Sequence, residues 1–250
     1  MAYGAAMAPS PSSFHLAAGE IAIVAVVAGL ALAAARAGRP SRARTVALAA
    51  GVALTAGVLL TPVATIALHY LLAAHLFQNV ALAEWVPLLL VLGIAPPLAD
   101  RLTANAPARA LTHPFVALPL WLVSYAVWHI PAVYDAALRN HALLALEHVS
   151  YLVTGLLLWW PVVQDAPHRL SNAARAVYVF AAFLLASPVG LLLTFLPDPI
   201  YGFYEEAPRL WGLSPLADQQ LAGVIMAGSE AIVFFAAFAF FLSRFLEDER

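Results

Sequence analysis

Long, nearly uninterrupted apolar stretches fill this chain, and short polar segments separate them. Each stretch holds about 20 residues or more, the length that an α-helix needs to cross a hydrocarbon core about 30 Å thick. They are too long, and alternate too little, for barrel strands. The pattern predicts an all-α integral membrane bundle of seven transmembrane helices, forming a single domain over residues 1–250. The predicted spans cover approximately residues 16–35, 46–66, 71–97, 114–132, 142–163, 173–196 and 218–243.

The boundary between the second and third spans is the least marked. From Val46 to Leu98 the chain is almost continuously apolar, which is enough for two spans and too long for one. Thr61-Pro62 and His69-Tyr70 are the only interruptions in this stretch. Because proline and polar residues interrupt a helical pattern, we expect a short loop around residues 62–70.

The composition supports a membrane protein and excludes several other classes. Of the 250 residues, 63% are hydrophobic and 10% are charged, whereas soluble domains are about 45–50% apolar and about 25% charged. A water-soluble protein of this size could not bury so much apolar surface. This excludes a soluble enzyme, and with a net charge of -2 it also excludes a nucleic-acid binder.

The arginines predict the orientation of the bundle. All 12 basic residues are arginine. If the N-terminus lies outside, the outer segments hold only Arg139 and Arg209. The cytoplasmic segments hold Arg36, Arg39, Arg42, Arg44, Arg101, Arg109, Arg169, Arg175, Arg244 and Arg250. The positive-inside rule therefore predicts an outer N-terminus and a cytoplasmic C-terminus. Residues 1–15 lack the basic residues of a signal peptide, so we expect the first span to be retained.

Polar residues inside the spans are the candidates for function, because burying them in lipid is costly. In the predicted orientation most of them lie in the outer half of the bundle, and Glu84 is the exception in the inner half. His75 and Asn79 are four residues apart and share a helix face, as do Tyr125 and His129. The outer-half group consists of Glu20, His75, Gln78, Asn79, His129, Glu147, His148, Asp218, Gln219, Gln220, Met226 and Glu230.

The chemistry of this group suits a transition metal. The chain has no cysteine, so a metal site would use imidazole, carboxylate, amide or thioether ligands, and copper is one metal that accepts such a set. The same residues would also suit a proton path or polar contacts between helices. Glu147 also fits a helix cap, and Glu84 fits a separate buried polar contact or a subunit contact. The candidate ligands are His75, Asn79, His129, Glu147, His148, Asp218 and Met226.

The other histidines, His15, His69, His113, His141 and His168, lie at span ends or in loops, where we expect interfacial positions.

Four stretches of the chain resemble one known family. They are AAHLFQN with PLLLVLGIAPP (residues 73–97), HPFVALPLWLVSYAVWHIPAVYDAAL (113–138), EHVSYLVTGLLLWWPVV (147–163) and PDPIYGFYEEAPRLWGLSPLADQQLAGVIM (197–226). In this order they resemble the CtaG family of cytochrome c oxidase assembly factors. The resemblance implies seven spans in the plasma membrane of a prokaryote. It also implies cytochrome c oxidase subunits as partners and a role in bringing copper to the catalytic centre.

The resemblance extends to individual residues. His75, His129 and His148 fall on the family's characteristic histidine positions, and Asp218 and Gln219 fall on its acidic-amide motif. The chain departs from the family at two places. Asn79 stands where a second histidine is common, and the residues up to Glu230 replace a Trp-Val-Pro-Gly type of sequence.

Four functions stay open on the sequence. The first is an oxidase assembly factor that assists copper delivery, and the second is an accessory subunit stably bound to an oxidase or another respiratory complex, with Glu84 and Glu230 as intersubunit contacts. A small transporter or proton conductor is a third, with Glu20 and Glu147 as further titratable steps. A conventional enzyme is least favoured, because the chain has no nucleotide-binding loop and no serine elbow motif, although paired imidazoles could ligate haem.

Overall fold

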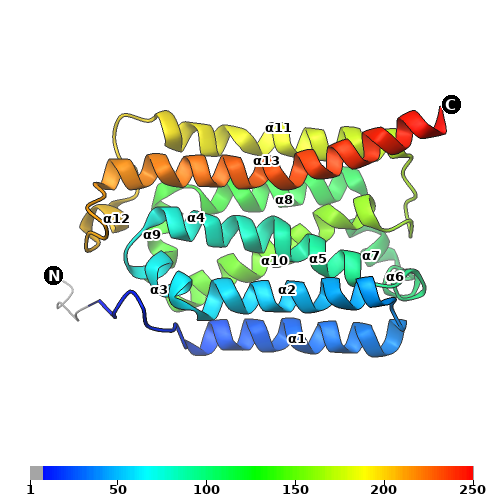
Figure 1. The fold of residues 1–250 in the computed structure, drawn as a ribbon, viewed down its shortest axis with the longest axis horizontal. Helices are drawn as coiled ribbons and strands as arrows, with labels where there is room; N and C mark the ends of the chain where they lie inside the picture. Colours follow the sequence, from blue (N-terminus) through cyan, green and yellow to red (C-terminus); the bar gives the residue numbers. More distant parts are fainter. Residues whose placement is uncertain (1–7, 250) are drawn as a thin grey trace.

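The computed structural model describes residues 8–249, and this part of the chain is helical without any strand. The long helices run side by side along the longest axis of the molecule (Figure 1). They are α1 (Ala18–Gly38), α2 (Arg42–Leu60), α4 (Leu72–Val80), α5 (Val86–Gly93), α8 (Pro114–Trp128), α10 (His141–Val163), α11 (Asn172–Phe195) and α13 (Pro215–Asp248). A π-helical turn, η1 (Ala81–Trp85), joins α4 to α5. The short helices are α3 (Pro62–His69), α6 (Pro96–Leu102), α7 (Ala106–Leu111), α9 (Pro131–Leu138) and α12 (Gly202–Glu206).

Six segments are long and apolar enough to cross a membrane, and the bent pair α8 and α9 gives a seventh candidate. The axes of this pair differ by 75°. The bend has a local cause, because Ile130 is extended before Pro131, which opens α9 and cannot continue the preceding helix. The fourth span, predicted as one helix over residues 114–132, is therefore broken after Trp128.

The loop predicted over residues 62–70 is wrong, because this segment forms α3. Pro62 occupies the first turn of α3, where its missing N–H costs nothing. The Thr61 hydroxyl caps the helix by accepting a hydrogen bond from the Val63 amide at 3.3 Å. The helical path is interrupted at Thr61, which is extended, and again at Tyr70 and Leu71, whose φ angles are −132° and −129°.

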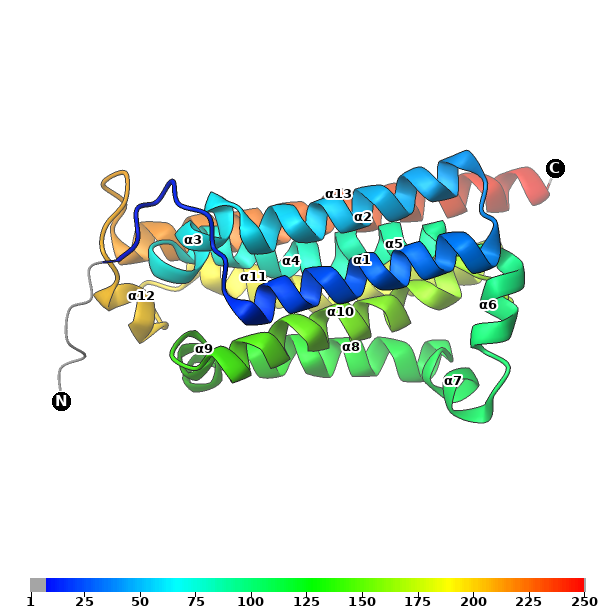
Figure 2. The same cartoon turned by 90° about the horizontal axis from the view of Figure 1, so that it is seen from below.

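The two ends of the bundle differ in charge. At one end lie the α1–α2 turn, α6, α7 and the C-terminal turn of α13, and at the other lie α3, α9 and α12 (Figures 1 and 2). The connection from α10 to α11 also lies at the first end (Figure 1). We call it the arginine end, because its segments carry Arg36, Arg39, Arg42, Arg44, Arg101, Arg109, Arg169, Arg175 and Arg244. The opposite end carries Arg139 and Arg209. This asymmetry underlies the predicted orientation, which stays a prediction.

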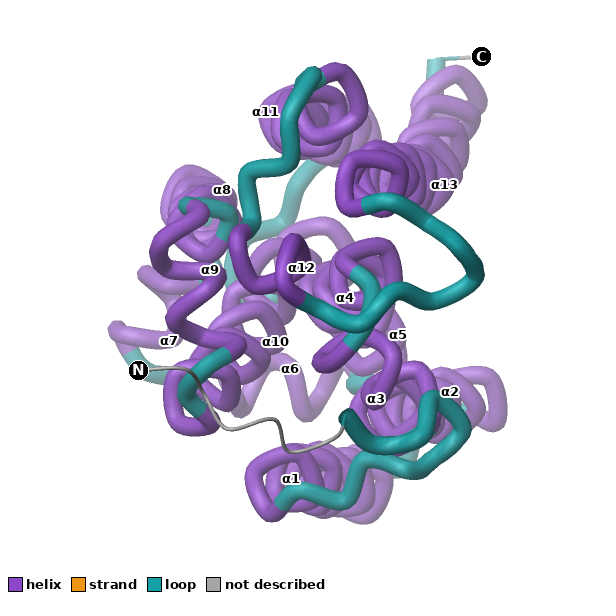
Figure 3. Tube along the Cα trace, turned by 90° about the vertical axis from the view of Figure 1, so that its left-hand side faces the viewer, coloured by secondary structure: helices purple, strands orange, loops and turns teal. Residues whose placement is uncertain are grey.

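The segment α4–η1–α5 lies at the centre of the bundle, in contact with α2, α10 and α13 (Figure 3). In its most apolar stretch 72% of the residues are buried, against 22% in α1. Gly155 allows α10 to approach η1, since a Cβ there would lie 2.3 Å from the Ala83 carbonyl oxygen.

The outer helices expose large apolar side chains along their length, such as Leu30, Val123, Leu192 and Ile232. A surface of this kind suits contact with membrane lipid rather than water.

Candidate metal-binding site

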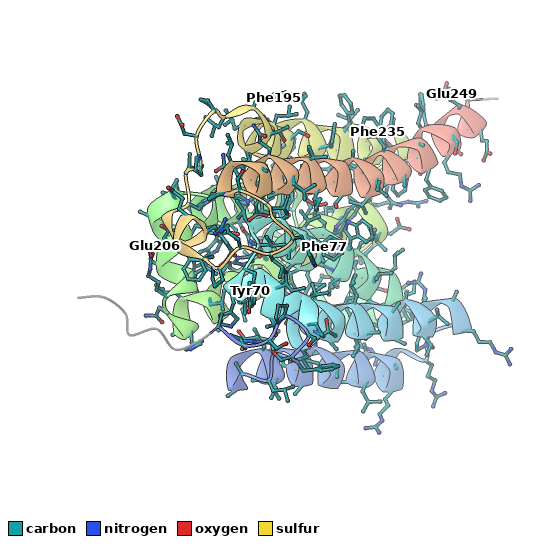
Figure 4. The ribbon with its side chains drawn as sticks, turned by 60° about the vertical axis from the view of Figure 1, so that its left-hand side comes forward. Tyr70, Phe77, Phe195, Glu206, Phe235 and Glu249 are labelled. Atoms are coloured by element: carbon teal, nitrogen blue, oxygen red, sulfur yellow. The ribbon has the colours of Figure 1, made fainter. Side chains whose placement is uncertain are left out.

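Three predicted ligands gather near the end of the bundle formed by α3, α9 and α12. Tyr70 and Glu206, both labelled in Figure 4, mark this end, whereas Glu249 lies at the arginine end. His75 of α4, His129 after α8 and His148 of α10 are all buried. The ring centroids of His75 and His148 are 6.4 Å apart. We call these three imidazoles the histidine cluster.

Tyr134 of α9 lies between two members of the histidine cluster. Its ring centroid is 5.0 Å from that of His75 and 6.4 Å from that of His129. The tilted ring of Tyr201 packs against Tyr134, with a centroid separation of 4.3 Å, and its hydroxyl donates to the His129 carbonyl oxygen at 3.1 Å. The bend between α8 and α9 thus folds an aromatic wall over the imidazoles.

Asp218 fixes the start of the helix that carries His75. Its Oδ2 accepts a hydrogen bond from the Leu72 amide at 2.8 Å, and its Oδ1 accepts one from the Ala73 amide at 3.0 Å. The first amides of a helix have no partner within that helix, so α13 supplies the cap for α4. Both oxygens of this predicted ligand are therefore engaged by the backbone.

Hydrogen bonding determines which nitrogen of His75 carries the proton. The Tyr204 hydroxyl donates its single proton to the Ala67 carbonyl oxygen at 2.5 Å. The Nδ1 of His75, 2.9 Å from the same hydroxyl, must then donate to it. Burial, and next the charge of Asp218, raises the pKa of Tyr204 well above its ordinary value, so the hydroxyl keeps its proton. The Nε2 of His75 is left with a lone pair.

His129 is oriented in the same way. Its Nδ1 lies 2.7 Å from the Tyr125 carbonyl oxygen, which can only accept, so Nδ1 is the donor and Nε2 carries the lone pair. Within residues 8–249 the Nε2 atoms of His75 and His129, and both ring nitrogens of His148, are buried without a hydrogen-bond partner. A hydrogen bond on one nitrogen that presents the other is the usual arrangement of a histidine ligand.

The remaining predicted ligands have different roles in this conformation. The Asn79 amide donates from Nδ2 to Glu147 Oε1 at 2.9 Å, which leaves Asn79 Oδ1 and Glu147 Oε2 without a partner in the described chain. The cap predicted for Glu147 is wrong, because Asn140 caps α10. Met226 is buried in the apolar core.

Taken together, the candidates do not form a closed metal centre. Among the residues that the structure describes, no three histidine, aspartate or glutamate side chains come close enough to hold an ion. What the fold provides is a set of oriented, unpartnered imidazole nitrogens behind an aromatic wall.

A second buried polar group lies deeper in the bundle. Tyr125 of α8 donates its hydroxyl proton to Glu230 Oε1. Glu84 of η1 is fully buried, its two oxygens have no hydrogen-bond partner in the described part of the chain, and its charge interacts with that of Glu230. We call Glu84 and Glu230 the carboxyl pair. The intersubunit contact predicted for these two residues is wrong, since both are enclosed by this chain.

Sequence reasoning missed the tyrosines of the site. Tyr201 and Tyr204 stand in the segment YGFYEE, whose aromatic content is also typical of a membrane interface. Both are instead buried. Their spacing of three residues, followed by two glutamates, was compatible with a helical turn such as α12, and that turn points both rings inward.

The histidines outside the cluster lie toward the two ends of the bundle. His113 and His168 pair at the arginine end, with ring centroids 4.7 Å apart. His15, His69 and His141 lie at the opposite end. Burial, and next the charges of His15 and His141, lowers the pKa of His69, so its imidazole is neutral at neutral pH.

Comparison with known families gives one match over most of the chain. The model described as cytochrome c oxidase caa3 assembly factor (Caa3_CtaG) matches residues 24–248. Uncharacterized proteins of Mycobacterium bovis and Mycobacterium tuberculosis are each 25% identical over 175 residues, covering 61% of this chain and 26% of theirs. An uncharacterized protein of Mycobacterium leprae is 24% identical over 175 residues, covering 61% of this chain and 27% of its own length. The chain thus spans about a quarter of the length of these relatives. No solved structure matches the chain.

Proposed function

Since the chain belongs to the Caa3_CtaG family of cytochrome c oxidase caa3 assembly factors, we propose that it hands copper to an oxidase subunit during assembly. The protein acts as a multi-pass component of a prokaryotic plasma membrane, with cytochrome c oxidase subunits as its partners and without catalysing a reaction. The observation that carries this proposal is the histidine cluster, in which hydrogen bonds orient His75 and His129 and each of the three imidazoles keeps a buried nitrogen without a partner in the described chain.

The open geometry of the cluster suits transfer rather than storage. Imidazole is a good ligand for copper, yet the three rings do not converge into a saturated site. A transient carrier needs ligands that another protein can replace. Lateral docking of the two proteins in the membrane would bring a copper ion held by the cluster to a similar depth in the oxidase.

Copper titration of the purified protein tests the proposal. The triple variant H75N/H129N/H148N should lose the copper(I) that the wild type retains against a competing chelator. The matched control is H113N/H168N, which removes two imidazoles at the arginine end and should bind as the wild type does. Equal copper retention by the triple variant and the wild type would remove the metal role.

The lack of a closed metal centre also supports a second candidate, an accessory subunit that stays bound to a respiratory complex. In that case the buried polar groups serve packing, and the protein should co-purify with mature oxidase in stoichiometric amounts and without copper. A carrier should instead be enriched on oxidase that has not yet received its metal. Isolating the oxidase before and after copper addition, and measuring how much of this protein co-purifies, distinguishes the carrier from the accessory subunit.

A further inference from the structure

The segment before α1 is held across one end of the bundle by specific hydrogen bonds. The His15 amide donates to the Leu60 carbonyl oxygen at 3.0 Å. The Thr65 hydroxyl donates to the Ser13 carbonyl oxygen at 2.8 Å, and the Tyr70 hydroxyl donates to the Pro9 carbonyl oxygen at 2.5 Å. These contacts fix His15 beside α3, so its side chain has a defined place in the fold.

His15 connects two groups that the sequence separates. Its Nε2 lies 3.7 Å from Glu20 Oε2, and its ring centroid is 6.3 Å from that of His69. This Nε2 is buried and has no hydrogen-bond partner among residues 8–249. A buried imidazole nitrogen beside a buried carboxylate is a combination that attracts a cation.

The polar groups continue on both sides of this pair. His69 interacts electrostatically with His15 and with His141, which is exposed. At the other side, α1, which carries the buried Glu20, contacts α10, which carries His148 of the histidine cluster. The groups therefore form a series that starts at the exposed His141, passes the half-buried His69 and His15, and ends at the buried Glu20 and His148.

We propose that His141, His69, His15 and Glu20 form an access path along which a soft cation, copper(I), reaches His148 from the end of the bundle. The proposal rests on the proposed function for its cargo. His15 and Glu20 precede residues 24–248, the part that matches the family, so family membership does not assign them this role.

The spacing of the groups favours passage over retention. No three of them converge into a metal site in the described chain, so each step offers few ligands and releases the ion readily. The single carboxylate, Glu20, lies where the ion would lose the last of its water, and its negative charge offsets that cost.

The rate of copper(I) uptake by the full chain in lipid nanodiscs tests the path, and the amount bound at equilibrium tests the proposed function. We expect H15N/H69N, and separately E20Q, to take up copper(I) from a chromophoric chelator about tenfold more slowly than the wild type. The equilibrium amount should be unchanged. H113N/H168N is the matched control for removing two histidines, and it should show the wild-type rate.

Three results would overturn the path. The first is a wild-type uptake rate in both H15N/H69N and E20Q. The second is loss of bound copper at equilibrium in a correctly folded H15N/H69N, which would make these residues part of the holding site. The third is absence of uptake by the wild type, which overturns the proposed function as well. The variant T65V/Y70F, which releases the segment without removing an imidazole, should also slow uptake.

Discussion

The histidine cluster and the carboxyl pair are both fully enclosed, yet they are built on opposite principles. In the cluster, a hydroxyl and a backbone carbonyl fix the ring tautomers of His75 and His129 and leave one lone pair free on each. In the pair, the Tyr125 hydroxyl donates to Glu230 alone, both Glu84 oxygens lack a hydrogen-bond partner, and no salt bridge in the described chain includes either acid. The cluster is organised to receive a positive charge, whereas the pair tolerates burial without one.

Tyr125 joins the two groups, because its hydroxyl donates to Glu230 and its carbonyl oxygen accepts from His129. The two groups nevertheless depend on different parts of the fold. The pair depends on the π-helical turn and on the close approach of α10, and the cluster depends on caps and aromatic packing at the end of the bundle. Mutations can therefore disturb one and spare the other.

The largest effect should follow from Gly155→Ala, which tests whether backbone packing positions the carboxyl pair. The new Cβ would lie 2.3 Å from the Ala83 oxygen and 2.6 Å from Pro87, so α10 and η1 must separate. We expect the free energy of unfolding to fall by about 3 kcal/mol. Circular dichroism during denaturation in detergent measures this fall.

Gly57→Ala is the matched control, since a Cβ at this helical position meets nothing within 4 Å. It should raise the free energy of unfolding by about 0.5–1 kcal/mol through helix propensity. A Gly155→Ala protein as stable as this control would mean that the close approach is dispensable, and the carboxyl pair would then need another explanation for its position.

A smaller loss should follow from Asp218→Ala, which removes the cap of the helix that carries His75. Two buried amide donors, those of Leu72 and Ala73, would lose their partner. We expect about 2 kcal/mol of destabilisation, with Asp218→Asn losing less because one acceptor remains. Bound copper, compared at a temperature where both proteins are folded, should be unchanged. Normal stability with lost copper would instead make Asp218 a ligand.

The helices were largely predictable because each is indicated by many apolar residues together rather than by one residue. A stretch of about 20 apolar residues has few alternatives in a membrane, and the helices found at α1, α10 and α11 lie close to the predicted ranges. The second span, predicted over residues 46–66, is shorter at its end, because α2 stops at Leu60. The predictions fail where a single residue determines the start, end or bend of a helix. Pro62 starts α3, Pro131 starts α9 after the bend, and Glu84 lies in the π-helical turn η1.

The site was predictable only in part, for a related reason. Spacing along one helix pairs residues such as His75 and Asn79, but it carries no information about which helices face each other. The contacts of Asn79 with Glu147 and of Tyr204 with His75 span 68 and 129 residues. The tyrosines were missed because an aromatic side chain gives the same sequence signal at a membrane interface and in a buried wall.

Tyr204→Phe tests the orientation of the histidine cluster and should have a moderate effect. Without the hydroxyl, His75 loses the acceptor that fixes its tautomer, and outer partners of this kind change metal affinity by about 10–100-fold. We expect copper(I) affinity to fall about tenfold in a chelator competition. The control is Tyr178→Phe, whose hydroxyl is buried without a hydrogen-bond partner in the described chain. If both variants bind copper equally well, the hydrogen bond does not organise a ligand.

The smallest effect should come from Glu84→Gln in the carboxyl pair. The amide keeps the shape of the side chain, removes the repulsion from Glu230 and can donate to its free Oε2. We therefore expect the free energy of unfolding to stay within about 1 kcal/mol of the wild type. Glu147→Ala near the histidine cluster should cost more, because the buried Asn79 amide would lose the oxygen that accepts its hydrogen bond. If Glu84→Gln instead destabilised the protein strongly, the pair would depend on a bound cation, and the contrast between the two regions would disappear.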